Sequence, residues 1–75
     1  MNLSRGQQIK SEFGQQLKKV REAQGMTKEE LANKADISRS QIYRIETGKI
    51  NPRLTTITLI AETLGMEVWE LLKKN

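Results

Sequence analysis

The sequence contains no cysteine and no histidine, and only one proline among its 75 residues. The absence of cysteine excludes disulfides, and the absence of both residue types removes the usual ligands of tetrahedral zinc. Thiol nucleophiles and imidazole general bases are excluded for the same reason. Carboxylates, Lys, Ser, Thr and one Tyr remain, but paired carboxylates such as Glu29-Glu30 fall on a solvated helix face and no glycine-rich phosphate loop is present. We therefore expect no metal, no cofactor, no small-molecule substrate and no catalytic residues, so that the protein is not an enzyme.

Long apolar segments are also missing. No run approaches the roughly 18 residues that a membrane-spanning helix needs, and the N-terminus lacks the apolar core of a signal peptide. Thirteen Lys and Arg residues outnumber nine Asp and Glu residues, which gives a net charge of +4. These features predict a soluble, cytoplasmic protein that makes no membrane contact and binds a polyanion.

Five short helices are predicted, because the apolar residues recur at helical rather than alternating spacing. Gly25, Gly48 and Gly65 each follow a periodic segment, at the place where a helix commonly ends in a left-handed residue. The inward positions in chain order are Ile9, Phe13, Leu17 and Val20, then Leu31, Ala32 and Ala35, then Ile42 and Ile45, then Ile57, Ile60, Ala61 and Leu64, and last Val68, Leu71 and Leu72. The fold class is therefore all-α, with a partly helical extension over residues 1–10 and one domain over residues 11–75.

Two capping boxes define the second and third helices. Thr27 precedes Glu30, and Ser38 precedes Gln41, each at the spacing that lets a side chain and a backbone N–H satisfy each other at a helix start. The two helices are separated by a turn of about three or four residues. Two short capped helices joined in this way are typical of a helix-turn-helix.

The outward face of the third helix carries cations, hydroxyls and an aromatic ring. If Ile42 and Ile45 define its inner side, a rotation of about 100° per residue turns the polar side chains outward. These side chains are Ser40, Tyr43, Arg44 and Thr47, with Arg39 at the N-terminal end. Residues 37–56 contain four Lys or Arg residues and one glutamate. Such a helix suits the major groove, where arginine binds guanine through two hydrogen bonds.

Residues from about Phe13 to Leu72 resemble the Cro/phage-repressor (Xre-type) helix-turn-helix family. The resemblance lies in Leu17-Lys-Lys-Val-Arg21, Gly25-Met-Thr-Lys-Glu-Glu-Leu-Ala32, Ile37-Ser38, Ile42, Ile45-Glu46, Gly48-Lys49, Pro52 and Leu64-Gly65. It implies a five-helix, lambda-repressor-like DNA-binding domain that is usually dimeric and acts as a transcriptional repressor or regulator. It also implies that the second and third helices bind the DNA.

The resemblance further implies roles for individual residues. The base-reading positions are Arg39, Ser40 and Arg44, with Tyr43 beside them; Tyr43 either contacts a phosphate or thymine methyl or packs over Arg39. The DNA-backbone positions are Lys28, Ser38, Lys49 and Arg53, to which the outward face adds Thr47. Arg21 and Glu46 match a structural pair through which the first helix anchors the end of the recognition helix.

Two apolar residues do not fit a monomer. Leu59 lies opposite the inner face of the fourth helix, and Trp69 projects beside the inner face of the fifth. They are either isolated exposed residues, which are common, or parts of a dimer interface. Because the family usually dimerises through this end, we favour a homodimer that binds a near-palindromic site.

The function predicted is therefore sequence-specific binding of double-stranded DNA by a nucleoid-associated transcriptional regulator. The alternative is an antitoxin-like or anti-repressor module whose helices bind a partner protein. The salt dependence of duplex binding separates the two, because phosphate contacts lose affinity steeply as salt rises.

Overall fold

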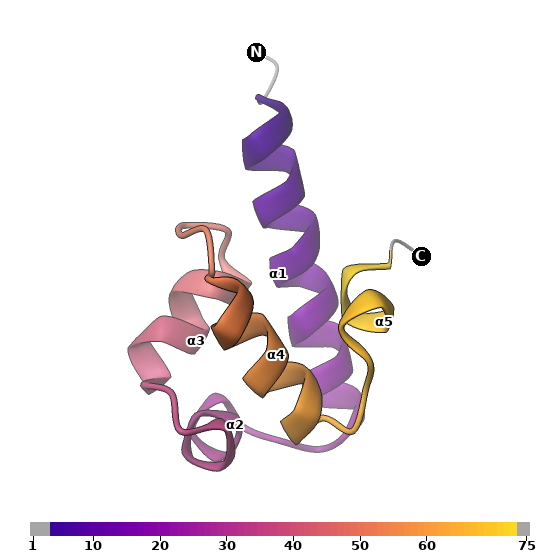
Figure 1. The fold of residues 1–75 in the computed structure, drawn as a ribbon. Coiled ribbons are helices and arrows are strands. Elements are labelled where there is room, and N and C mark those ends of the chain that lie inside the picture. The colour runs from indigo at the N-terminus through magenta and orange to yellow at the C-terminus, as the bar shows by residue number, and fades with distance from the viewer. Residues whose placement is uncertain (1–3, 74–75) are drawn as a thin grey trace.

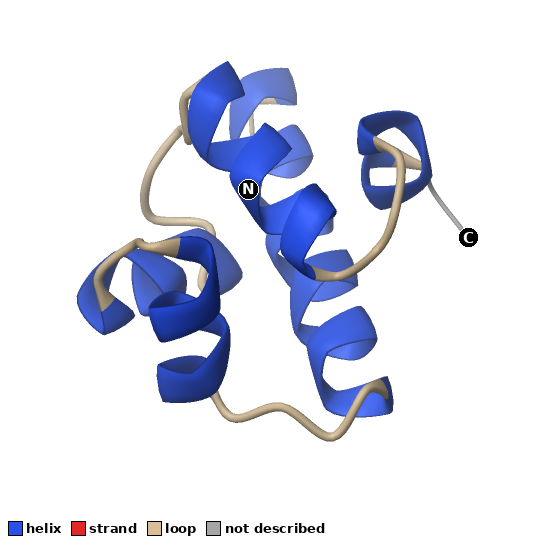
Figure 2. Ribbon diagram, turned by 60° about the horizontal axis from the view of Figure 1, so that its bottom comes forward, coloured by secondary structure: helices blue, strands red, loops and turns tan. Residues whose placement is uncertain are grey.

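The computed structural model describes residues 4–73, and within them the chain forms five α-helices and no strands (Figure 1). The helices are α1 (Arg5–Ala23), α2 (Lys28–Ala35), α3 (Arg39–Glu46), α4 (Leu54–Thr63) and α5 (Val68–Leu72). Figure 2 shows that the described loops between them are short. The all-α, five-helix prediction is confirmed.

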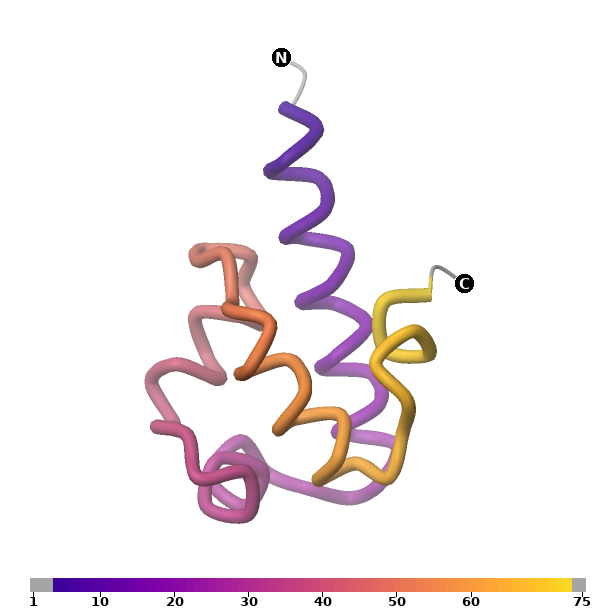
Figure 3. The backbone as a smooth tube through the Cα atoms, viewed as in Figure 1, coloured from indigo at the N-terminus to yellow at the C-terminus, as the bar shows by residue number. Residues whose placement is uncertain are grey.

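Helix α1 packs against two of the other helices. It packs against α3 on one flank and against α5 on the other, while α2 packs against α3 and α4. The Cα trace in Figure 3 shows the first turns of α1 extending beyond the body formed by the other helices. Within residues 4–73, no helix combines the length and the apolar character needed to cross a lipid bilayer.

The core contains side chains from all five helices. Its largest fully buried members are Leu17, Leu31, Ile42, Ile45, Ile60 and Leu71. Each of these belongs to the inward positions predicted from helical spacing. Val20, Ile57 and Val68 are partly buried and pack against this cluster.

Two residues expected on the inner faces are exposed instead. Ile9 is 48 % exposed and Leu72 is 53 % exposed. Ile9 and Leu72 line the same open groove between the N-terminal half of α1 and the end of α5, and no other described element covers it. The prediction that they belong to the inner faces was wrong, because helical periodicity identifies a side of a helix but not whether another element covers it.

The helix ends follow the expected chemistry. Gly25, Gly48 and Gly65 have φ values of 72°, 72° and 69°, which confirms the left-handed helix ends. The capping box of Thr27 and Glu30 is complete, with Glu30 N–H donating to Thr27 Oγ1 over 3.0 Å and Thr27 N–H donating to Glu30 Oε1 over 2.9 Å. Hydrogen bonding of the Glu30 carboxylate to the Thr27 backbone N–H, and secondarily to the Thr27 side chain, lowers the pKa of Glu30.

Gly14 lets α1 and α3 approach closely. A Cβ atom at Gly14 would collide with the backbone carbonyl oxygen of Ile45 and would lie 2.7 Å from that of Glu46. Both carbonyl groups belong to the last turn of α3. The backbone of α1 therefore lies directly against the C-terminal end of α3, and a side chain at position 14 would separate the two helices.

Candidate nucleic-acid interface

A three-residue turn separates α2 from α3. Asp36 ends α2 in the left-handed conformation, with φ 59° and ψ 45°, and Ser38 begins α3 by accepting a hydrogen bond from Gln41 N–H over 3.1 Å. Ser38 thus provides its half of the second predicted capping box, but the Gln41 side chain makes no return bond to Ser38 N–H, so the prediction of a complete box was wrong. Sequence reasoning missed Asp36, although Asp and Asn are among the residues that most readily adopt this conformation.

The outward side of α3 is open to solvent. Its buried apolar residues, Ile42 and Ile45, face α1 and α2 and hold the helix in one orientation. The exposed residues are Arg39, Ser40, Tyr43, Arg44 and Thr47. The side chains expected to read bases therefore share an unobstructed surface, and their roles in binding stay a prediction.

The pair expected between Arg21 and Glu46 is present at the C-terminal end of α3. Arg21 Nε donates to Glu46 Oε2 over 2.7 Å, and Nη2 donates to Oε1 over 3.0 Å. A third bond runs from Arg21 Nη1 to the carbonyl oxygen of Met26 over 2.7 Å. The hydrogen bonds to Glu46 raise the pKa of Arg21. Arg21 and Glu46 are 4 % and 7 % exposed, so the pair joins α1, the α1–α2 loop and α3 in a desolvated position.

The N-terminal ends of α2 and α3 form a shallow hollow. Lys28 and Arg39 line it together with Thr27 and two glutamates, Glu22 and Glu29. Lys28 is half-buried, whereas Arg39 is exposed. The fold thus brings a predicted backbone-contacting cation next to a predicted base-reading cation, although they are separated by a helix and a turn in the chain.

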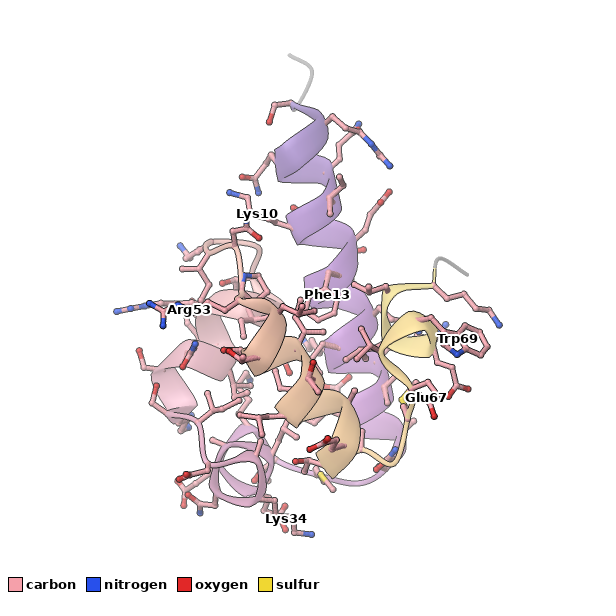
Figure 4. The ribbon with its side chains drawn as sticks, in the orientation of Figure 1. Lys10, Phe13, Lys34, Arg53, Glu67 and Trp69 are labelled. Atoms are coloured by element: carbon pink, nitrogen blue, oxygen red, sulfur yellow. The ribbon has the colours of Figure 1, made fainter. Side chains whose placement is uncertain are left out.

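A second pair of cations lies on the loop between α3 and α4. Lys49 follows the left-handed Gly48, and its N–H donates to the carbonyl oxygen of Arg44 over 2.9 Å. Arg53 is the exposed residue immediately before α4 and makes no side-chain capping bond. Figure 4 shows Arg53 extending from the side of the molecule that carries α3. Lys49 and Arg53 therefore flank the C-terminal end of α3, as Lys28 flanks its N-terminal end.

The hydroxyl groups assigned to the DNA backbone already have partners in the fold. Ser38 Oγ caps α3, and Thr47 Oγ1 donates to the carbonyl oxygen of Tyr43 over 2.8 Å. Both residues are exposed. Each hydroxyl oxygen keeps a lone pair, but Thr47 has already used its single proton within α3.

The two residues assigned to a dimer interface are exposed on neighbouring helices. Leu59 of α4 is 43 % exposed and Trp69 of α5 is 63 % exposed. Helices α4 and α5 pack against each other. In Figure 4 the ring of Trp69 projects away from the body, on the side opposite Arg53. A contact through Trp69 would therefore leave the cationic side of the molecule uncovered.

Comparison with known families identifies the fold. The helix-turn-helix family model HTH_3 matches residues 17–68, which covers α2, α3, α4 and the C-terminal part of α1 from Leu17 onward. The chain belongs to this helix-turn-helix family. The match confirms the resemblance to Cro/phage-repressor (Xre-type) proteins, a family of DNA-binding transcription regulators.

Individual helix-turn-helix relatives agree with this assignment. The immunity repressor protein of Bacillus phage phi105 is 40 % identical over 55 residues, which cover 73 % of this chain and 38 % of the repressor. An SPbeta prophage-derived HTH-type transcriptional regulator of Bacillus subtilis is 36 % identical over 61 residues, which cover 81 % of this chain and 56 % of the regulator. The chain thus spans about 40 to 60 % of the length of these curated relatives.

Solved helix-turn-helix structures share the fold. The restriction-modification controller protein C.AhdI of Aeromonas hydrophila has a TM-score of 0.80 at 36 % identity, and the alignment covers 81 % of this chain and 92 % of that protein. The competence regulator ComR of Streptococcus vestibularis also has a TM-score of 0.80, at 37 % identity, covering 85 % of this chain and 22 % of ComR.

Proposed function

We propose that this protein is a sequence-specific regulator of transcription that places α3 in the major groove of double-stranded DNA. The observation that carries the proposal is the exposed face of α3, which presents Arg44 away from the buried Ile42 and Ile45, with Arg39 exposed at the N-terminal end of the helix. An α-helix fits the major groove, and arginine reaches the O6 and N7 atoms of guanine together. Ser40 and Tyr43 lie on the same face and complete the proposed base-reading set.

Cations on both sides of α3 support this orientation. We assign Lys28, at the start of α2, to the backbone next to the N-terminal end of α3. We assign Lys49 and Arg53 to the backbone next to its C-terminal end, and Ser38 and Thr47 to polar contacts along the same side. A helix inserted into the major groove has a DNA strand on either side. Cations at both ends of α3 would therefore lie close to the phosphates of both strands.

A homodimer is part of the proposal. Leu59 and Trp69 are apolar, exposed and carried by adjacent helices, as a surface covered by a second copy requires. A two-fold dimer would present two α3 helices about 34 Å apart, which corresponds to one turn of B-form DNA and a near-palindromic site. We infer that the regulator represses transcription, as the name of the phage relative states for that protein, and acts on the nucleoid in the cytoplasm.

The base-reading assignment is tested with Arg44→Ala and Lys49→Ala on a duplex selected from a random pool. Arg44→Ala should weaken the selected site by about 1–3 kcal/mol and relax the preference at one base position. Lys49→Ala should weaken binding to all duplexes about equally. It should also lower the number of counterions released on binding, measured from the salt dependence, by about one. If Arg44→Ala leaves the preference of every base unchanged, α3 does not read the groove as proposed. If the unmodified chain binds no duplex at physiological salt, the chain is instead an interaction module.

The dimer assignment is tested by sedimentation of the Leu59→Glu and Trp69→Glu variant. We expect a folded monomer with weakened operator binding, because two carboxylates cannot be buried against each other without cost. For sedimentation alone, Ile9→Glu provides a matched control, since Ile9 is similarly exposed but lies outside the proposed dimer interface. An unchanged sedimentation coefficient for the double variant would reject this interface.

A further inference from the structure

One face of α1 follows the end of α3 and the loop beyond it. Gly14 lies against the last carbonyl groups of α3, and one turn earlier Ser11 lies against Gly48, where an added Cβ would be 3.2 Å from Ser11 Cα. A further turn earlier, Gln7 Nε2 donates to the carbonyl oxygen of Gly48 over 3.1 Å and to Ser11 Oγ over 3.3 Å. The first turns of α1 therefore hold the beginning of the α3–α4 loop from outside the helix-turn-helix.

Lys10 belongs to this face. It lies three residues after Gln7 and four before Gly14, which is the spacing of one helix side. Lys10 is half-buried, as are Gln7 and Ser11, whereas Gln8 and Ile9 are exposed. Figure 4 shows Lys10 and Arg53 on the same side of the molecule, with Trp69 on the opposite side.

The surroundings of Lys10 are rich in positive charge, and the loop beside it carries no acid. The other members of its helix face, Gln7, Ser11 and Gly14, are uncharged. The adjoining loop over residues 48–53 carries Lys49 and Arg53 and no Asp or Glu. Three cations from α1, the loop and the start of α4 thus lie on one side of the domain, and like charges gathered in this way favour binding of an anion.

We propose that the first turns of α1 are part of the DNA interface, with Lys10 contacting a phosphate beside those bound by Lys49 and Arg53. Gln7 is a positioning residue that holds the α3–α4 loop through Gly48. This inference rests on the proposed function and extends it, because the family match begins at residue 17 and leaves Gln7 and Lys10 outside. The extra phosphate contact is therefore a property of this chain rather than of the matched segment.

The test compares Lys10→Ala with Lys19→Ala on a mixed-sequence duplex. Lys19 is exposed on the same helix but lines a groove against α5, so its removal makes the same charge change on another face. We expect Lys10→Ala to reduce the slope of log K against log salt by about 0.9, which corresponds to about fivefold weaker binding at 0.15 M salt. Lys19→Ala should leave the slope unchanged, and Lys10→Arg should restore it.

The positioning role of Gln7 is tested by comparing Gln7→Ala with Gln8→Ala. Gln8 is the control because its side chain is exposed. We expect faster hydrogen exchange at the Lys49 amide and weaker duplex binding in Gln7→Ala alone, because the loop loses its anchor on α1. Circular dichroism of each variant checks that the helices remain.

The results separate a failure of the proposed function from a failure of the Lys10 contact. An unmodified chain without salt-dependent binding would overturn both the proposed function and this inference. An unmodified chain that binds with a steep slope, together with a Lys10→Ala slope equal to it, would overturn this inference alone. An unchanged Lys49 amide in Gln7→Ala would remove the positioning role of Gln7.

Discussion

Glu46→Gln offers the sharpest test of how the recognition helix is held. Both carboxylate oxygens of Glu46 accept hydrogen bonds from Arg21, and both residues are almost completely buried. The substitution keeps the shape of the side chain but removes its charge. The guanidinium group is then left in a desolvated position with the carbonyl oxygen of Met26 as its other acceptor.

The expected loss is large for a domain of this size. Removal of one partner from a buried ion pair costs about 3–5 kcal/mol, because the remaining charge is uncompensated. A chain of 75 residues has a total stability of about 4–11 kcal/mol at the usual values per residue. Since the glutamine oxygen still accepts one hydrogen bond, we expect about 3 kcal/mol, which lowers Tm by about 15 °C.

Urea unfolding followed by circular dichroism measures this loss, with Glu62→Gln as the matched control. Glu62 is an exposed glutamate of α4, and its neutralisation should change stability by less than about 0.5 kcal/mol. The double variant Arg21→Met with Glu46→Leu should recover most of the loss, because an apolar pair carries no desolvation penalty. A loss below about 1 kcal/mol for Glu46→Gln would show that water reaches the pair, and would refute its role as a desolvated anchor of α3.

Two further predictions concern stability. Gly14→Ala should destabilise the domain by about 1–3 kcal/mol, because the new Cβ would press on the backbone of α3. Gly6→Ala, with open space around it, should stabilise the domain by up to about 1 kcal/mol; equal effects at the two positions in thermal unfolding would contradict the close approach. The lowered pKa of Glu30 means that its capping bond contributes stability above the unfolded pKa of about 4.3, and this contribution is lost as the pH falls through the folded value. The stability gap between the unmodified chain and Glu30→Ala should therefore narrow in acid, and a gap that is constant from pH 7 to about pH 3 would exclude the linkage.

Much of the helix-turn-helix was predictable because its signals are local. A hydroxyl three residues ahead of an N–H partner defines a helix start, as at Thr27 and Ser38, and a glycine after a periodic segment defines a helix end. The exposed face of α3 follows from the positions of Ile42 and Ile45 alone.

The interactions that support this unit were less accessible from the sequence. The hydrogen bond from Gln7 to Gly48 joins residues 41 positions apart. A glutamine on a polar helix face has no sequence pattern from which its hydrogen-bond partner could be predicted. A second glutamine, Gln24, donates to the carbonyl oxygen of Leu64 over 2.9 Å and ties α1 to the end of α4 in the same way. Ile9 and Leu72 were misassigned for a related reason, since their exposure depends on where neighbouring helices stop.

The sequence by itself determined the five helices, the capped and glycine-terminated ends among them, and the side of α3 that carries Arg44, because each depends on contacts within a few residues. The tertiary structure alone decided which inward positions are covered, and which part of α1 lies beside the α3–α4 loop. Those outcomes depend on how helices of unequal length pack, and this is set by the whole core rather than by any one segment. The placement of Lys10 on the same side as Lys49 and Arg53 was likewise decided by the tertiary structure.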